Sequence, residues 1–341
     1  MFEYVGVVHV HSSFSDGTGK CDEIANFANE VGLDFCLLSD HNTLRGKDNG
    51  FEGWYGNTLL MIGCEINDKF NQNHYLAFGI DKNPSTRLPA KEYVKYVKDS
   101  GGVGFIAHPM EKRSSMKEHP PYPWNEWTSE DFDGIEIWNH MSEWMEGLKK
   151  YNKLNMLISP RRSLKSPTDR ILRIWDELNL SKKIAGIGSI DVHGFPYKVG
   201  FLKLIIFPYK VQFKSIRTHL LLNEQLSGDL EVAKRQIYDA IRECRLFISN
   251  YRWGNANNFR MEMILDDKKI GIGDTGMFCE GAKLQIDLPL AGEMTIIRNG
   301  KLYGQFNGSH RDFPISSKGL YRAEIKRGGK GWIYTNHIRV E

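Results

Sequence analysis

Short apolar runs alternate with amphipathic stretches along the first three quarters of the chain. The apolar runs predict strands near residues 4–10, 35–39, 59–64, 75–80, 103–107, 134–138, 184–190, 201–206 and 246–249. Apolar positions at helical spacing predict helices over residues 20–31, 89–99 and 229–244. Because strands and helices alternate, the pattern indicates a mainly parallel sheet with helices outside it.

The pattern changes after about residue 255, where apolar and polar residues alternate singly, as over residues 283–288 and 321–326. Arg298-Asn299-Gly300-Lys301 is typical of a tight β-hairpin. This part predicts a small antiparallel β-sandwich. We therefore expect two domains, residues 1–254 and residues 255–341, with a helical insertion at about 143–180 in the first.

Composition narrows the class of protein. The chain has 341 residues, of which 26% are charged and 41% hydrophobic, and its net charge is +3. That charge balance disfavours nucleic acid as a partner. The sequence has no apolar run of about 18 residues and no signal-peptide pattern, which predicts no membrane partner. The cysteines show no Cys-x-x-Cys spacing, which favours a reducing cytoplasm: Cys21, Cys36, Cys64, Cys244 and Cys279.

Histidines and carboxylates gather where the apolar runs end. A side chain at the carboxyl end of a barrel strand points into the barrel mouth, where active sites are built. The residues at such junctions are His9, His11, Asp16, His41, Glu65, His74, His108, Asp191 and His193. Nine nitrogen and oxygen ligands at one edge of a sheet would hold two or three divalent metal ions.

Each of these residues also has an ordinary structural interpretation. A single His-x-His pair such as His9 and His11 is common in proteins, and Asp16 in a Ser/Gly-rich loop is typical of a turn. Glu65 is more informative, because a carboxylate at a buried strand end is costly unless it is paired or binds a metal. The combination of all nine at strand ends favours the metal centre.

In order and spacing, these motifs resemble those of the PHP (polymerase and histidinol phosphatase) superfamily. They are His9-Val-His11-Ser-Ser-Phe-Ser-Asp16-Gly, Ser-Asp40-His41, Gly-Cys-Glu65, Ala-His108-Pro and Asp191-Val-His193-Gly, over roughly residues 4–250. The resemblance implies a distorted (β/α)7 TIM-like barrel, followed here by the β-sandwich, and up to three metal ions. Zinc, manganese and iron all suit histidine with carboxylate ligands.

The resemblance also implies how the ligands divide. His9, His11, Glu65 and Asp191 would bind one metal. Glu65, His74 and His108 would bind a second, with Glu65 bridging the two. Asp16, His41 and His193 would bind a third. We expect catalytic roles for Glu65, Asp191 and Asp40. Asp40, beside His41, would orient a ligand or shuttle a proton, and a supporting role is favoured because a metal-bound histidine usually needs a carboxylate or carbonyl partner.

Four cations follow ligand strands or prolines and are candidates for binding substrate phosphate, namely Lys112, Arg113, Arg161 and Arg162. Solvated surface charge is the alternative for each. Residues 120–127 form an aromatic, proline-rich segment after a ligand strand. This segment is either a lid that stacks a ring of the substrate or a loop that packs against the barrel.

The sequence thus predicts a metal-dependent hydrolase. The leading hypothesis is a phosphoesterase that cleaves a small phosphate ester or a nucleotide by attack of a metal-bridging hydroxide. A carbamate or amide hydrolase using the same metals is the first alternative. A non-catalytic binding or assembly module is the second. The sequence does not determine an oligomeric state.

Overall fold

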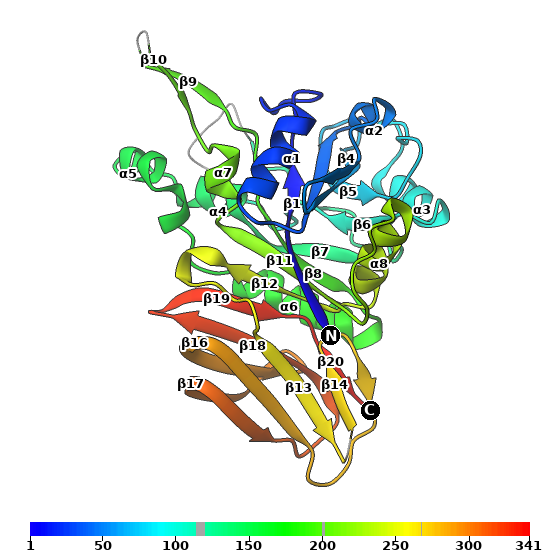
Figure 1. Cartoon of the computed structure of the whole chain (residues 1–341), viewed down its shortest axis with the longest axis vertical. Coiled ribbons are helices and arrows are strands. Elements are labelled where there is room, and N and C mark those ends of the chain that lie inside the picture. Colours follow the sequence, from blue (N-terminus) through cyan, green and yellow to red (C-terminus); the bar gives the residue numbers. More distant parts are fainter. Residues whose placement is uncertain (114–119, 200–201, 267) are drawn as a thin grey trace.

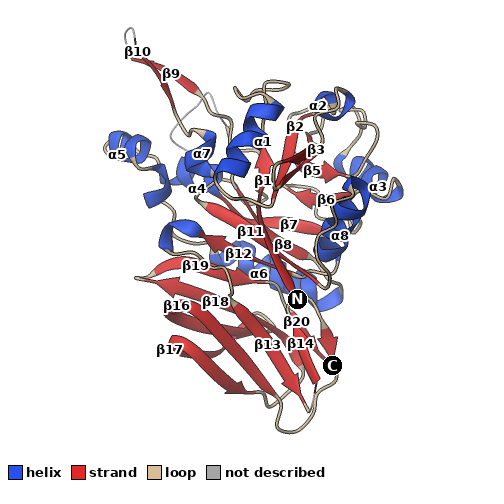
Figure 2. Ribbon diagram, viewed as in Figure 1, coloured by secondary structure: helices blue, strands red, loops and turns tan. Residues whose placement is uncertain are grey.

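The computed structural model describes residues 1–113, 120–199, 202–266 and 268–341. An α/β part lies at one end of the molecule and a set of antiparallel strands lies at the other (Figure 1). Helices surround the sheet of the α/β part and are absent from the described residues of the antiparallel part (Figure 2). This division matches the change of pattern near residue 255.

The strands of the α/β part are β1 (Phe2–Val10), β2 (Phe35–His41), β3 (Gly53–Tyr55), β4 (Thr58–Ile66), β5 (Tyr75–Phe78), β6 (Val103–Ile106), β7 (Gly134–Asn139), β8 (Ala185–Ser189), β9 (Pro196–Val199), β10 (Leu202–Ile205), β11 (Ile216–Leu222) and β12 (Leu246–Asn250). Its helices are α1 (Cys21–Glu30), α2 (Arg45–Asp48), α3 (Ala90–Asp99), α4 (His140–Gly147), α5 (Lys153–Ile158), α6 (Asp169–Ser181), α7 (Tyr209–Gln212) and α8 (Leu230–Arg242). Two short 3-10 helices are η1 (Pro160–Arg162) and η2 (Tyr251–Trp253).

The sheet is mixed rather than mainly parallel. β1 pairs in parallel with β2, β2 with β4, β6 with β7 and β7 with β8. β5 runs antiparallel to both β4 and β6. The link from β4 to β5 is too short for a parallel crossover, which needs a dozen or more residues. The start of β5 therefore lies at the edge where its neighbours end.

A closed barrel is not confirmed by the strand ladders. β1 pairs along its first half with the antiparallel β11. In the described residues, the link between the end of β8 and β1 consists of an isolated bridge that joins Val10 to Val192 and of main-chain bonds such as that from the Ile190 amide to the Val8 carbonyl (3.1 Å). These contacts nevertheless bring residues 190–192 beside the end of β1.

Two strand predictions need correction. The predicted strand 201–206 corresponds to β10, which pairs only with β9 in a separate two-stranded hairpin, and residue 201 lies outside the described residues. β11 was not predicted, because Arg217 and His219 interrupt its apolar run. Both side chains find partners elsewhere in the fold: Arg217 stacks on the Tyr251 ring (3.9 Å), and His219 contacts Glu3 (2.9 Å).

The later strands are β13 (Arg260–Leu265), β14 (Lys268–Gly271), β15 (Thr275–Gly276), β16 (Lys283–Arg298), β17 (Lys301–Pro314), β18 (Gly319–Arg327), β19 (Lys330–Thr335) and β20 (Ile338–Val340). The predicted hairpin is confirmed, because Arg298 pairs with Lys301 across Asn299 and Gly300. Asn299 and Gly300 both have positive φ angles (49° and 74°), as such a two-residue turn requires.

The two parts of the molecule are joined by hydrogen bonds as well as by packing. β12 pairs with β19, so one hydrogen-bonded network continues from the α/β part into the later strands. The Asn336 side chain bonds the amide and the carbonyl of Gly186 (2.8 and 2.9 Å). Asp176 of α6 accepts from both Arg322 and His337. The later strands therefore brace the end of the α/β part that lies away from the predicted ligands.

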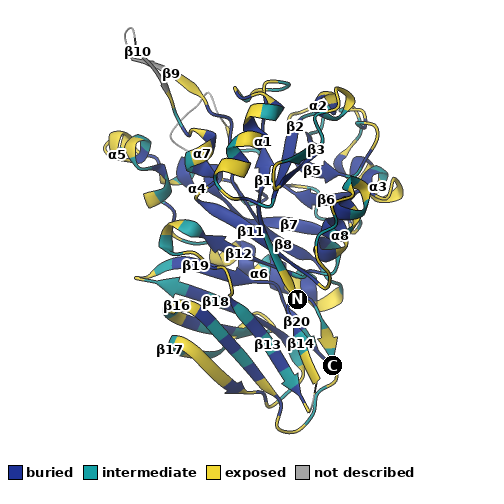
Figure 3. Ribbon diagram, in the orientation of Figure 1, coloured by how far each residue is buried: buried dark blue, intermediate teal, exposed yellow. Residues whose placement is uncertain are grey.

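Buried residues occur throughout both parts of the molecule (Figure 3). Two apolar clusters pack against the strands and helices of the α/β part. Another lies mainly among the later strands and includes Phe247, Leu284 and Trp332. Within the described residues, no helix is both long enough and apolar enough to cross a bilayer.

Candidate metal centre

The end of β1 carries the first two ligands. His9 and His11 are fully buried, and their ring centroids lie 5.0 Å apart. Simple strand alternation is not the whole reason that they converge. His9 has a φ of 67°, and the pairing register with β2 shifts between Val8 and Val10. This irregularity changes the direction of the strand at the point where the two imidazoles enter the cluster.

Glu65 of β4 lies at the centre of the cluster and is 1% exposed. Its carboxylate oxygens lie within 3.3 Å of a nitrogen of five histidines: His74 (2.7 Å), His9 (3.0 Å), His108 (3.1 Å), His11 (3.3 Å) and His41 (3.3 Å). His74 immediately precedes β5 and reaches this edge because β5 runs antiparallel to its neighbours.

Two further carboxylates flank Glu65. Asp191 Oδ1 lies 3.4 Å from Nε2 of both His9 and His11. Asp16 Oδ2 lies 3.3 Å from His193 Nε2 and 3.6 Å from His41 Nε2. The Asp16 side chain is 49% exposed, whereas that of Asp191 is 6% exposed. The Asp16 side of the cluster is thus its open side.

All nine predicted ligands occur in four overlapping groups whose ligand atoms lie within 4.8 Å of one another. The groups are His11, Asp16, His41 and His193; His9, Glu65 and His108; His9, His11 and Asp191; and His41, Glu65 and His74. They differ in detail from the division that the resemblance implied, because His41 also lies beside Glu65 and His74, and His11 also lies beside Asp16.

The histidines and carboxylates of the cluster shift one another's pKa values. Burial lowers the pKa of His9, but Asp191 and Glu65 outweigh burial and raise it well above its usual value. Burial also opposes the charged forms of His11 and His108, yet the facing carboxylates raise the pKa of each to about 9. Burial raises the pKa of Glu65, and the surrounding histidines bring it well below its usual value. Cationic partners therefore suit these carboxylates.

The donor set fits divalent metal ions. Among the predicted ligands, four buried imidazole nitrogens have no hydrogen-bond partner in the described residues: both ring nitrogens of His11, Nε2 of His74 and Nδ1 of His108. Buried polar atoms are normally bonded, so such orphans call for an explanation. Neutral imidazole nitrogens facing carboxylate oxygens are the ligands that zinc, manganese and iron accept.

Asp40 is not among these groups. Its carboxylate accepts from the Ser12 amide (2.8 Å), the Ser12 hydroxyl (2.5 Å) and the Ser15 hydroxyl (2.7 Å). The residue thus holds the loop that carries Asp16, rather than contacting the ring of His41. A supporting role fits this geometry better than proton transfer.

The four predicted phosphate-binding cations differ in their surroundings, and Arg113 lies over the ring of Tyr122 (5.4 Å), which stacks on the ligand His74. The Arg113 guanidinium lies 2.5 Å from Glu111, and Arg161 donates to the Lys214 carbonyl (2.9 Å). Arg162 lines a separate pocket beside α5, and Lys112 is exposed.

The aromatic loop both packs and reaches the centre. Trp124 is buried in the core, as the packing interpretation expected. Tyr122 instead stacks on the His74 ring, with centroids 4.9 Å apart. Phe195 stacks in the same way on His193 (4.8 Å). Aromatic rings therefore support two of the ligand histidines.

Sequence reasoning missed two residues that hold the ligands. Glu136 of β7 accepts a hydrogen bond from His9 Nδ1 (2.7 Å). The Tyr209 hydroxyl lies 2.8 Å from the His11 carbonyl and 3.0 Å from that of His193. Glu136 carried the same signal as Glu65, a carboxylate within an apolar strand. Tyr209 carried none.

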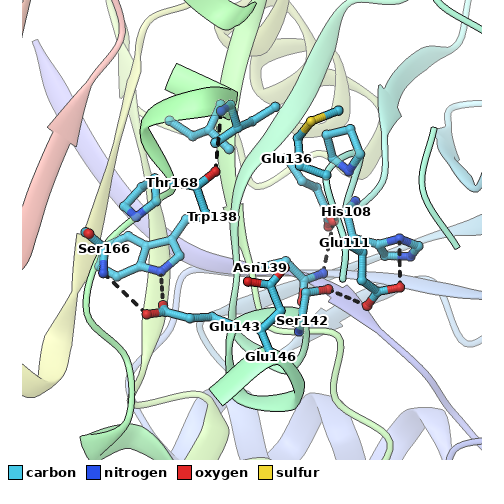
Figure 4. Close-up of a pocket in the computed structure, with 15 residues that line it drawn as sticks. His108, Glu111, Glu136, Trp138, Asn139, Ser142, Glu143, Glu146, Ser166 and Thr168 are labelled. Carbon is cyan, nitrogen blue, oxygen red and sulfur yellow. Dashed lines mark hydrogen bonds and ion pairs between the residues drawn. The ribbon is translucent and has the colours of Figure 1, made fainter. Parts of the chain in front are cut away.

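A cavity adjoins the cluster on the far side of Glu136 and His108 (Figure 4). It has a volume of about 60 Å3, opens to solvent, and lies between β7, α4 and the start of α6. Its carboxylates are engaged by protein donors. Glu143, for example, accepts from Trp138 Nε1 (2.6 Å) and from the Lys165 amide (2.5 Å).

Comparison with known proteins finds similarity in structure only. No family model and no curated protein matches the chain. A two-domain protein from Bacteroides vulgatus, containing a predicted PHP-like metal-dependent phosphoesterase, has 16% sequence identity and a TM-score of 0.50, over 98% of this chain and 95% of its own. PsfC from Pseudomonas syringae has 12% identity and a TM-score of 0.43, over 68% of this chain and 88% of its own.

A protein from Bifidobacterium adolescentis described as a metal-dependent phosphoesterase has 16% identity and a TM-score of 0.38, over 61% of this chain and 94% of its own. At these identities the comparisons bear on the fold alone. The similarity to the Bacteroides protein extends over both parts of the chain, so it supports an α/β fold with additional C-terminal strands, whereas the closed barrel is not confirmed.

Proposed function

We propose that this chain is a metal-dependent hydrolase whose centre binds two to three divalent metal ions. One observation carries the proposal: the buried Glu65 carboxylate lies within 3.3 Å of nitrogens from five histidines. Burying so many titratable groups together is costly unless ions or protons compensate them. Zinc, manganese and iron are the candidate ions.

Divalent ions bound here would lower the pKa of a water molecule to near 7 and so supply a nucleophile at neutral pH. Glu65 belongs to two of the ligand groups, one with His9 and His108 and the other with His41 and His74, so it would be shared between ions bound by those groups. Asp191 and Glu65 converge on His9 Nε2 from two sides. The exposed Asp16 group then provides the face at which substrate would approach.

We infer a phosphoesterase acting on a small phosphate ester or a nucleotide. The sequence motifs and the PHP-like fold of the Bacteroides protein support this class of substrate. Several closely spaced metal sites also suit phosphoryl transfer, because two ions can hold both the attacking and the leaving oxygen.

A carbamate or amide hydrolase is the second candidate, and one observation favours it. Arg113, one of the two predicted cations that follow the ligand His108, is paired with Glu111 (2.5 Å), which neutralises its charge. An uncharged carbonyl substrate needs no such cation. The two candidates therefore differ in whether a phosphate group is required.

The test combines metal analysis with a substrate panel. We expect at least two metal ions per chain and turnover of phosphate esters in preference to aryl carbamates, with each substrate assayed in the presence of zinc, manganese or iron. His9→Ala and Glu65→Ala should abolish turnover, while Glu177→Ala, an exposed carboxylate on α6, should not. Less than one ion per chain would contradict the proposal and favour a non-catalytic module.

A further inference from the structure

Glu136 is a buried carboxylate beside the candidate centre. It belongs to none of the four ligand groups, and its side chain is inaccessible to solvent. It lies on β7, where the register with β8 shifts between Glu136 and Trp138. Such irregularities re-aim side chains next to functional sites.

Each protein group around this carboxylate offers a hydrogen to it. Oε1 accepts from His9 Nδ1 (2.7 Å). Oε2 accepts from the His108 backbone amide (2.6 Å) and from Asn139 Nδ2 (3.0 Å). One side chain therefore contacts two predicted ligands, one through its ring and the other through its backbone (Figure 4).

We propose that Glu136 is a positioning residue that sets the tautomer of His9 and the backbone of His108 for metal binding. The inference rests on the proposed metal centre and adds to it a residue that binds no ion itself. Carboxylates face both ring nitrogens of His9, with Glu136 Oε1 at Nδ1 (2.7 Å) and Glu65 Oε2 (3.0 Å) and Asp191 Oδ1 (3.4 Å) at Nε2. A ring that bound an ion through Nε2 would keep its proton on Nδ1, where Glu136 can only accept and would hold it.

The backbone gives an independent reason for this role. His9 and His108 both have positive φ angles (67° and 28°), a region that residues other than glycine seldom adopt. Such conformations persist where the surrounding structure enforces them. Glu136 contacts both residues, and its bond to the His108 amide holds the second directly.

The Asn139 amide makes Glu136→Gln an informative variant. Asn139 Oδ1 accepts from the Ser142 amide at the start of α4, so its Nδ2 must face residue 136. A glutamine there would place its own NH2 group against a donor, whichever way it turned. The variant keeps the size of the side chain and removes its charge and one acceptor.

The experiment compares Co2+ binding by the wild type, Glu136→Gln and Glu143→Gln. Glu143 is a matched control, because it is largely buried near β7 but bonds only Trp138 and backbone amides. Affinity is measured by competition with a chelator, and geometry by the visible absorption of bound Co2+. We expect Glu136→Gln to bind about 10–100-fold more weakly, with an altered spectrum, and Glu143→Gln to match the wild type.

A double variant separates positioning from general damage. If Glu136 acts through the two histidines, its substitution should cost less affinity in a His9→Ala background, because one route is already lost. A folded Glu136→Gln protein with wild-type affinity and spectrum would overturn the inference. Wild-type protein that binds no Co2+ would overturn the proposed function as well, so the two failures are distinguishable.

One measurement is made on the wild-type protein and does not require a folded Glu136→Gln variant. Long-range 1H–15N NMR of the zinc-loaded wild type, with the His9 signals assigned from His9→Ala, reports which ring nitrogen carries the proton. We expect the proton on Nδ1. A proton on Nε2 of His9 would overturn the assignment of Glu136.

Discussion

Replacing Asp176 by alanine should destabilise the junction between the two parts of the chain. Asp176 Oδ1 accepts from Arg322 Nε (2.6 Å) and His337 Nε2 (2.8 Å), and Oδ2 accepts from Arg322 Nη2 (2.7 Å). Arg322 is 2% exposed. Asp176→Ala would leave this guanidinium buried with Glu324 as its remaining carboxylate partner (2.7 Å).

The magnitude follows from that geometry. Removing one partner of a buried ion pair costs about 3–5 kcal/mol, and the surviving contact to Glu324 places the expected loss at about 3–4 kcal/mol. An unfolding entropy of about 2.1 cal/mol/K per residue over 341 residues converts this loss into a fall of about 4–6 °C in melting temperature.

Differential scanning calorimetry at neutral pH measures the change, and Glu177→Ala is the matched control. Glu177 is the next residue on the same helix and is exposed, so its loss should change the stability by at most about 0.5 kcal/mol. Metal content should be unaltered in both variants. A melting temperature for Asp176→Ala within 1 °C of the Glu177→Ala value (about 0.7 kcal/mol on the same conversion) would refute the assigned role of this buried pair.

Three further predictions concern the centre and its surroundings. Zinc or manganese at about 100 times its dissociation constant should stabilise the fold by about 2.7 kcal/mol, seen as a rise in melting temperature that a chelator reverses. Burial raises the pKa of the Glu143 carboxyl to about 7. The ionised carboxylate therefore lowers the free energy of unfolding above pH 7, and this destabilisation disappears as the pH falls toward 4.5. Glu143→Gln should therefore gain about 2–3 kcal/mol relative to wild type between pH 5 and pH 8, measured by urea unfolding at each pH; an unchanged difference would contradict this linkage. Asp40→Ala should cost about 1–3 kcal/mol by freeing the loop at Ser12 and Ser15, with metal loss confined to the Asp16 group in elemental analysis.

The positions at which the ligand strands end were predictable, because the change from apolar to polar residues is a local feature of the sequence. The apolar run at 59–64 lies within β4, and the polar residue that follows the run, Glu65, is the centre of the cluster. The same logic located the first ligands at the end of β1. Placement of His74 was less secure from sequence, because it precedes its strand, and only the antiparallel course of β5 brings it to the same edge.

Residues whose role depends on a distant partner were not predictable in this way. Glu136 and Glu65 look alike in sequence, as carboxylates within apolar strands. Glu65 faces five imidazoles, whereas Glu136 faces three donors and no open ligand position.

By itself, the sequence determined most of the segments that become strands, where the polar ends of the ligand strands lie, and that the character of the chain changes near residue 255. These features depend on short-range periodicity and on which side chains tolerate burial. Only the tertiary structure decided the mixed direction of the sheet, the grouping of the ligands and the difference between a ligand and the residue that orients it. Those depend on distances between residues as far apart as His9 and Glu136, which the fold brings together and local pattern does not encode.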